Sequence, residues 1–216
     1  TILELKEEIG FDADVPILDP KTKELDEKRM QYANSFWESR KRRGITLLDA
    51  QKWMRERNYF AAMMVNEGEA DALVTGYSRS YPSTVKPIMQ LIDKAPGVSR
   101  IATTNMMMTN RGPIFFSDTA INMNPTADDL AKIALMTAKT VRMFGLQPVV
   151  AMVSYSNFGS SSSESAEKVR QAVAYLHKYY PDLIVDGEIQ ADFALNPEML
   201  KDKFPFSKLA GKKVNT

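Results

Sequence analysis

Three segments of this chain share one layout, an apolar run that stops abruptly in small polar residues. They cover residues 72–80, 114–126 and 149–159. In the middle segment the run Ile114-Phe115-Phe116 breaks into Ser117-Asp118-Thr119, and an asparagine-rich turn follows. Polar clusters at strand ends are where α/β proteins hold their ligands. The sequence therefore predicts a cleft lined by three strand ends.

From residue 70 onward, apolar runs of strand length alternate with amphipathic helical segments. We expect strands at 72–75, 100–108, 113–117, 148–153 and 183–186, and helices at 82–94, 127–144 and 164–180. The helix from Ala127 is marked most clearly, because Thr126 and Asp129 have the spacing of a capping box and Gly145 follows the last helical residue. This alternation predicts an α/β fold with a mostly parallel sheet and helical crossovers.

The first part of the chain has a different sequence pattern, which is rich in charged residues and indicates helices. A helix is expected from about residue 23 to 43, ending at Gly44, with one apolar stripe formed by Met30, Ala33, Phe36 and Trp37. We therefore assign residues 1–69 to a helical front part that belongs to a first subdomain and a linker. Residues 70–216 form the α/β subdomain.

Composition narrows the classes of function. Of the 216 residues, 44% are hydrophobic, which is enough for a sizeable core. Lys and Arg number 28 against 27 Asp and Glu, so the net charge of +1 creates no global attraction for nucleic acid or a membrane surface. The absence of cysteine excludes disulfides and thiolate catalysis and fits a reducing compartment. No apolar run approaches the roughly 20 residues of a membrane span, so we expect a cytoplasmic protein.

The common signatures of catalytic sites are missing from the sequence. It contains no Gly-x-Gly-x-x-Gly, no Walker loop and no Gly-x-Ser-x-Gly. The one histidine, His177, falls inside an expected helix and is interpreted as a surface residue, since a lone histidine lacks partners for a metal site. Any chemistry must therefore use Asp, Arg, Lys, Ser and backbone amides.

Two strand ends carry groups suited to anions. The loop Asn157-Phe158-Gly159-Ser160 has the form of an anion cradle, since glycine lets backbone amides approach a ligand. Simple helix capping by serine explains the same residues equally well. Ser78 and Arg79 offer a hydroxyl and a guanidinium for a phosphate or carboxylate, although an arginine on the surface needs no ligand.

Other charged residues have plain structural interpretations. Asp118 could take up a proton, hold a backbone turn, or pair with Arg79 or Arg111, and structural hydrogen bonding is the favoured role. The run of four cations at 40–43 would attract phosphates, but a solvated helix end is the better explanation.

Four ordered segments resemble a known family. The sequences ADALVTG at 70–76, SDTAINMNPTA at 117–127, VAMVSYS at 150–156 and LIVDGEIQADFA at 183–194 resemble the phosphate acetyltransferase and butyryltransferase family. The resemblance runs from about residue 16 to the end of the chain. Within the family, the loops at 75–79 and 156–160 look most like the acetyltransferase-like domain fused to NADP-dependent malic enzymes.

The resemblance implies two subdomains with an acyl-CoA cleft between them, and a homodimer as the basic unit. The implied ligands are acetyl-CoA or a related CoA thioester, and phosphate, without a metal or redox cofactor in this domain. NADP and a divalent metal are expected only in a fused malic enzyme domain. Relative to the family the chain is expected to be incomplete at both ends, lacking the late Ser-Arg-Gly motif, and so to be inactive as a fragment.

The resemblance also assigns residues. Arg40 matches a family arginine near the cleft, whereas Lys86 stands where active members carry a second arginine, and lysine cannot supply the same bidentate fork. No complete catalytic set is expected. The residues expected to bind CoA or phosphate are Arg40, Ser78, Arg79, Lys86, Asn122, Asn124, Ser154, Ser156, Asn157 and Gly159.

Three functions follow as hypotheses. The leading one is an acetyl-CoA-binding regulatory domain of a malic enzyme that oxidatively decarboxylates malate to pyruvate, in which Lys86 and the malic-enzyme-like loops are the motivating features. The alternative is part of an active phosphate acetyltransferase that exchanges acetyl-CoA and phosphate for acetyl phosphate and CoA. The third is an oligomerisation scaffold with a vestigial cleft.

Overall fold

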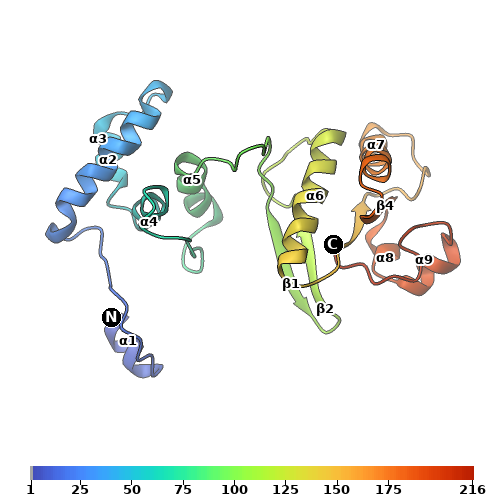
Figure 1. The fold of residues 1–216 in the computed structure, drawn as a ribbon, viewed down its shortest axis with the longest axis horizontal. Helices are drawn as coiled ribbons and strands as arrows, with labels where there is room; N and C mark the ends of the chain where they lie inside the picture. Colours follow the sequence, from blue (N-terminus) through green and yellow to red (C-terminus); the bar gives the residue numbers. More distant parts are fainter. Residues whose placement is uncertain (1) are drawn as a thin grey trace. The chain divides into compact units, whose positions relative to one another are not determined.

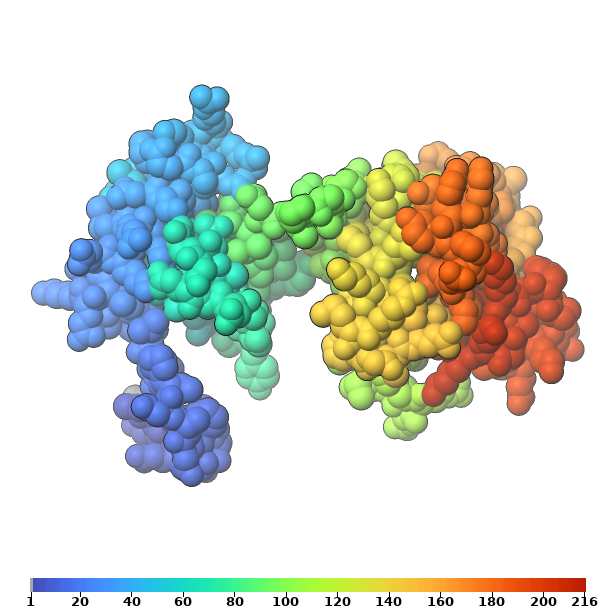
Figure 2. All heavy atoms as spheres, in the orientation of Figure 1, coloured from blue at the N-terminus to red at the C-terminus, as the bar shows by residue number. Residues whose placement is uncertain are grey.

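The computed structural model describes residues 2–216, which form two units (Figures 1 and 2). The front unit runs to Asp93, and the second unit runs from Lys94 to Thr216. Each unit has its own hydrophobic core. The division into subdomains at residues 69 and 70 stays a prediction.

The front unit is helical. Its elements are α1 (Ile2–Glu8), η1 (Lys23–Leu25), α2 (Asp26–Arg40), η2 (Lys41–Arg43), α3 (Leu47–Trp53), α4 (Arg57–Asn66) and α5 (Tyr81–Leu91). The expected helical stretch at 23–43 is confirmed and ends at Gly44, whose φ of 81° closes it. The predicted stripe is partly wrong, because Met30 is 46% exposed and Tyr32 takes its place in the core, where its ring centre lies 5.1 Å from that of Phe60.

The expected strand at 72–75 is absent. Residues 72–75 are irregular and Val74 is 96% exposed. A strand persists only where a neighbouring strand satisfies its backbone groups, and none pairs with this segment among residues 2–216.

The second unit opens with a hairpin of β1 (Thr104–Thr109) and β2 (Gly112–Ser117). The two strands are antiparallel, with Thr109 opposite Gly112. Only two residues separate them, whereas a parallel connection requires a crossover of about a dozen residues or more. The expectation of a mostly parallel sheet is therefore not confirmed, and the fold is mixed α/β.

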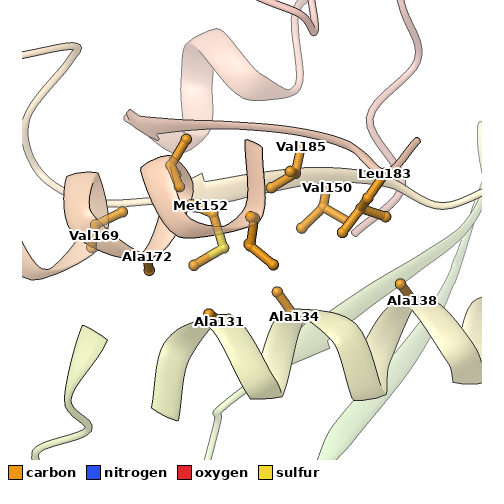
Figure 3. Close-up of a cluster of buried hydrophobic side chains, with 11 residues drawn as sticks. Ala131, Ala134, Ala138, Val150, Met152, Val169, Ala172, Leu183 and Val185 are labelled. Atoms are coloured by element: carbon orange, nitrogen blue, oxygen red, sulfur yellow. The ribbon is translucent and has the colours of Figure 1, made fainter. Parts of the chain in front are cut away.

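Two further strands do form the expected parallel unit. β3 (Val149–Val153) and β4 (Ile184–Ile189) pair in parallel, joined by the crossover helix α7 (Glu164–Tyr179). Helix α6 (Ala127–Met143) packs beside them through alanines, as Figure 3 shows for Ala131, Ala134 and Ala138 facing Met152 and Val150. Such small side chains allow a helix to approach a sheet closely. The predicted capping box of Thr126 and Asp129 is confirmed.

The opposite face of β3 and β4 is covered by the end of the chain. The short helices α8 (Ala191–Ala194) and α9 (Pro197–Lys203) contribute Ala194 and Leu200 to a second core with Ala151 and Ile189. β3 and β4 are therefore covered on both faces, which fits the continuous apolar sequence of β3, whereas β4 carries Asp186 and Glu188 in its interior. No helix within residues 2–216 is long and apolar enough to cross a membrane.

Gly187 provides a test of the close contact between β3 and β4. A Cβ atom at this position would lie 2.4 Å from the Met152 carbonyl oxygen, and the glycine has a φ of 145°. We expect Gly187→Ala to lower the free energy of unfolding by about 2 kcal/mol or more, measured by chemical denaturation.

Gly145→Ala is the matched control. Gly145 also has a positive φ, 72°, but no atom lies within 4 Å of the added Cβ. This substitution should lower the free energy of unfolding by only about 1 kcal/mol, which is the backbone strain of a non-glycine residue at positive φ. Equal losses for the two variants would contradict the packing argument.

Candidate functional site

The loop that follows β3 is organised around one buried carboxylate, that of Glu188 in β4. Glu188 is fully buried, and its Oε1 accepts hydrogen bonds from Ser156 Oγ at 2.8 Å and from the Gly159 amide at 2.8 Å. Its backbone carbonyl accepts the Phe158 amide at 2.8 Å. One residue of β4 therefore holds three polar groups of the loop, from Ser156, Phe158 and Gly159.

Arg170 on α7 supplies the opposite charge. Its Nη1 lies 2.7 Å from Glu188 Oε1 and also donates to the Ser161 carbonyl at 2.9 Å. Burial of Glu188 disfavours its charged form, but the bonds from Gly159 and Ser156 and the charge of Arg170 outweigh it, so the pKa of Glu188 lies below its usual value. Its carboxylate is therefore charged at neutral pH.

The backbone amides of the predicted anion cradle already have hydrogen-bond partners within the chain. The Gly159 amide donates to the Glu188 carboxylate, the Asn157 amide to Ser160 Oγ at 2.9 Å, and the Ser160 amide to the Asn157 carbonyl at 3.0 Å. Gly159 has a φ of 93°, which a glycine adopts without strain. A phosphate bound at these amides would have to replace the Glu188 carboxylate at Gly159 and the internal partners of the Asn157 and Ser160 amides. Phosphate binding by the loop stays a prediction.

Side-chain amides fix the outer part of the same loop. Asn157 Nδ2 donates to Gln190 Oε1 at 2.7 Å, and the Gln190 amide donates back to Asn157 Oδ1 at 2.8 Å. The Ser154 amide donates to the Ile189 carbonyl, and Ser154 Oγ accepts the Ser156 amide at 3.4 Å. Ser163 caps α7 through the Ala166 amide, as the serine run predicted.

The turn after β2 is held by Asp118. Asp118 Oδ1 accepts a hydrogen bond from Asn122 Nδ2 at 2.9 Å, and Asn122 also donates to the Ile101 carbonyl at 3.1 Å. The structural role favoured for Asp118 is confirmed by these bonds. Arg111 instead donates to the Leu195 carbonyl at 3.2 Å. Asn124 accepts Lys168 Nζ at 2.7 Å, which connects this turn to the first turns of α7.

The ends of β2 and β3 meet at one cavity of about 390 Å³. Ser117 and Asp118 line it from β2 and the turn that follows, and Val153 lines it from β3. Two of the three predicted strand ends therefore do lie together. The third, with Ser78, belongs to the front unit, so a cleft shared by all three stays a prediction.

In the front unit, cations gather around a cavity of about 220 Å³. Arg57, Arg79 and Lys86 line it together with Trp53 and one acidic residue, Glu56. Lys86 Nζ lies 5.4 Å from the centre of the Trp53 ring, and Arg57 Nη2 donates to Ser78 Oγ at 3.1 Å. Arg79 and Lys86, two of the residues expected to bind CoA or phosphate, therefore line one cavity, and Ser78 is linked to it through Arg57. Their binding role stays a prediction.

Arg40 lines a different cavity of the front unit, of about 260 Å³. Its neighbours there include Arg43, Ser39, Gln90 and Asp93. No residue lines both cavities, so within this unit Arg40 is not grouped with Lys86.

Sequence reasoning missed four residues of these sites. Glu188 and Arg170 were overlooked because their role depends on contact between α7, β4 and a loop about 30 residues away in the chain. Arg57 and Trp53 were overlooked because they belong to helices in which the cationic and aromatic residues form no recognised sequence motif. His177 is half-buried, with Nε2 2.7 Å from the Val185 carbonyl, so its surface assignment is only partly correct.

Many enzymes and ligand-binding domains have a mixed α/β architecture with polar loops at the ends of their strands. The chain belongs to the phosphate acetyl/butaryl transferase family, whose sequence pattern matches residues 3–214.

Individual relatives support the same assignment. A phosphate acetyltransferase of Clostridium acetobutylicum is 37% identical over 218 residues, covering 97% of this chain and 65% of the relative. A phosphotransacetylase structure from Streptococcus pyogenes has a TM-score of 0.80 and 38% identity, covering 99% of this chain and 64% of that one. An NADP-dependent malic enzyme of Salmonella typhimurium is 38% identical over 87% of this chain and 25% of the relative. The chain spans less than two thirds of each of these relatives.

The carboxylate of Glu188 predicts a pH-dependent contribution to stability. Because folding lowers its pKa from 4.5, the folded state binds a proton less readily than the unfolded state. The stabilisation is complete above pH 4.5 and is lost as pH falls through the folded-state pKa. We expect Glu188→Gln to lower the free energy of unfolding by about 2 kcal/mol near pH 7 and by less at acidic pH. Unfolding monitored by circular dichroism at several pH values measures this.

Two controls accompany this prediction. Glu198→Gln removes an exposed carboxylate and should leave the pH profile unchanged. Tryptophan fluorescence reports the front unit alone, because Trp37 and Trp53 both lie there, and it should not respond to Glu188→Gln. A variant that loses the same stability at every pH would argue against a charged Glu188.

Proposed function

We propose that this chain is part of a phosphate acetyltransferase, which exchanges acetyl-CoA and phosphate for acetyl phosphate and CoA. The supporting observation is the family match over residues 3–214, together with a relative named phosphate acetyltransferase that aligns with 97% of the chain. In the exchange, a phosphate oxygen attacks the thioester carbonyl, the C–S bond breaks, and the CoA thiolate leaves and is protonated. The reaction needs neither a metal nor a redox cofactor.

The cationic cavity of the front unit is the proposed phosphate site. Arg57, Arg79 and Lys86 line it, and charged donors can neutralise a phosphate and hold it for attack. We assign to the polar loops of the second unit, with Asn122, Ser154, Ser156 and Gly159, the binding of the CoA thioester. We further propose a homodimer in the cytoplasm.

Lys86 gives the sharpest test of the proposed transfer. In the full-length enzyme, we expect Lys86→Ala to reduce phosphate-dependent release of CoA from acetyl-CoA by at least about tenfold, since it removes a charge that the transition state requires. Lys86→Arg should retain activity. Lys139→Ala, on an exposed position of α6, is the matched control. Undiminished CoA release by Lys86→Ala would exclude this cavity as the phosphate site.

A second candidate is the acetyltransferase-like domain of a malic enzyme. The observation that favours it is the malic enzyme relative, 38% identical over 87% of this chain. Lys86 in place of the family arginine supports it as well. In such a protein the domain would bind acetyl-CoA and regulate malate decarboxylation, while NADP and a divalent metal would be bound by a separate domain.

Titration of acetyl-CoA against the full-length protein distinguishes the two candidates. If the domain is regulatory, acetyl-CoA should change the rate of NADP-dependent malate oxidation by about fivefold or more, and phosphate should release no CoA. If it is a transferase, CoA release should require phosphate and no malate should be oxidised. Calorimetry showing no binding of acetyl-CoA would contradict both and leave the scaffold hypothesis.

A further inference from the structure

Two stacked aromatic rings line the cationic cavity of the front unit. Trp53, the last residue of α3, and Tyr59, in α4, have ring centres 5.3 Å apart and ring planes 18° apart, and both side chains line the cavity. The ring centre of Phe36 in α2 lies 6.0 Å from that of Trp53 and 5.9 Å from that of Tyr59. Because Phe36 and Tyr59 are buried in the core of the unit, their packing fixes the plane of the Trp53 ring.

Helix α5 presents two polar side chains to this pair of rings. Lys86 and Gln90 are four residues apart, so they lie on the same face of the helix. Tyr59 Oη donates a hydrogen bond to Gln90 Oε1 at 2.6 Å, and Lys86 Nζ lies 5.4 Å from the centre of the Trp53 ring. One ring therefore holds α5 through a hydrogen bond, and the other contacts the cation of the same helix face.

A second lysine of the front unit also lies over a tryptophan, which allows a comparison. Lys41 Nζ is 5.2 Å from the centre of the Trp37 ring, but Lys41 also forms an ion pair with Glu38. Within residues 2–216, Lys86 forms no ion pair with a carboxylate. Contact with the Trp53 ring neutralises no charge, so the Lys86 ammonium keeps its full charge for an anion.

The other two cations of the cavity also lack carboxylate partners. In the part of the chain that the structure describes, neither Arg57 nor Arg79 forms an ion pair, although Glu56 lines the same cavity. Arg57 donates to the neutral Ser78 hydroxyl instead. Like charges that share a cavity repel one another, and a bound anion relieves this repulsion.

We propose that Trp53 is the positioning residue of this cavity. Its ring attracts the Lys86 ammonium by a cation–π contact and holds it at the cavity wall, where a bound phosphate can reach it. Lysine carries its charge on a long flexible stem and cannot form the bidentate fork of an arginine. A ring of fixed orientation compensates for that flexibility. The inference rests on the proposed phosphate site and adds the residue that organises it.

Binding of inorganic phosphate to the full-length protein, measured by calorimetry, tests this inference without requiring turnover. We expect Trp53→Leu to raise the dissociation constant for phosphate by about two- to fivefold, the range of a cation–π contact at an exposed site. Trp53→Phe keeps an aromatic face and should fall between Trp53→Leu and the unaltered protein. Trp37→Leu is the matched control, because it removes a ring that contacts a lysine outside this cavity, and it should leave the constant unchanged.

The double variant distinguishes positioning from general support of the fold. When Trp53→Leu is combined with Lys86→Ala, the dissociation constant should equal that of Lys86→Ala alone, because the ring then has no cation to hold. A ring that only supports the fold would weaken phosphate binding by the same factor with and without Lys86. Should Trp53→Leu not fold, as judged by circular dichroism, Trp53→Phe is combined with Lys86→Ala in the same comparison.

Failure of this inference is distinguishable from failure of the proposed phosphate site. If Lys86→Ala weakens phosphate binding but the folded Trp53 variants do not, the cavity remains a phosphate site and the role of Trp53 is overturned. An equal factor for the Trp53 substitution in both backgrounds overturns that role as well. If Lys86→Ala leaves phosphate binding unchanged, the cavity is not the phosphate site, and both proposals are overturned.

Discussion

The ion pair between the buried Glu188 and the partly exposed Arg170 is the interaction on which the candidate site of the second unit depends. A carboxylate without exposure to water is tolerated only when several donors compensate its burial. Here the donors are the Ser156 hydroxyl, the Gly159 amide and the Arg170 guanidinium, each within 2.8 Å of the same oxygen. Since these groups come from a loop and a helix, the charge on β4 fixes the position of both.

This arrangement changes how the loop after β3 is understood. A glycine-containing turn before a helix is a common way to bind phosphate, and the sequence was interpreted in that light. In the structure the turn already holds an anion from its own chain. The loop is thereby preorganised without a ligand, and the cations that we propose to bind phosphate line a cavity beside Trp53 in the front unit.

Local signals in the sequence predicted the local structure well. The capping box at Thr126, the glycine stop at Gly44 and the parallel pair with its crossover helix are set by residues close together in the chain. The expectation of a mostly parallel sheet is not confirmed, because the two residues between β1 and β2 leave room only for an antiparallel turn. The strand at 72–75 could not be judged from its own residues, because a strand exists only with a neighbour.

The candidate site was predictable only in part, for a related reason. Ser156 and Gly159 were identified because serine and glycine after a strand are a recognised pattern, but no local pattern marked Glu188. Its importance comes from burial against Arg170, and no short motif encodes that contact.

The most direct test of this account follows Glu188 and Gly159 together by nuclear magnetic resonance during an acid titration. The carboxyl carbon of Glu188 and the amide proton of Gly159 should shift in a single shared transition, with a midpoint below the ordinary glutamate value of 4.5. A midpoint above 4.5, or a Gly159 amide that does not respond when Glu188 is protonated, would contradict the claim that this buried charge organises the loop.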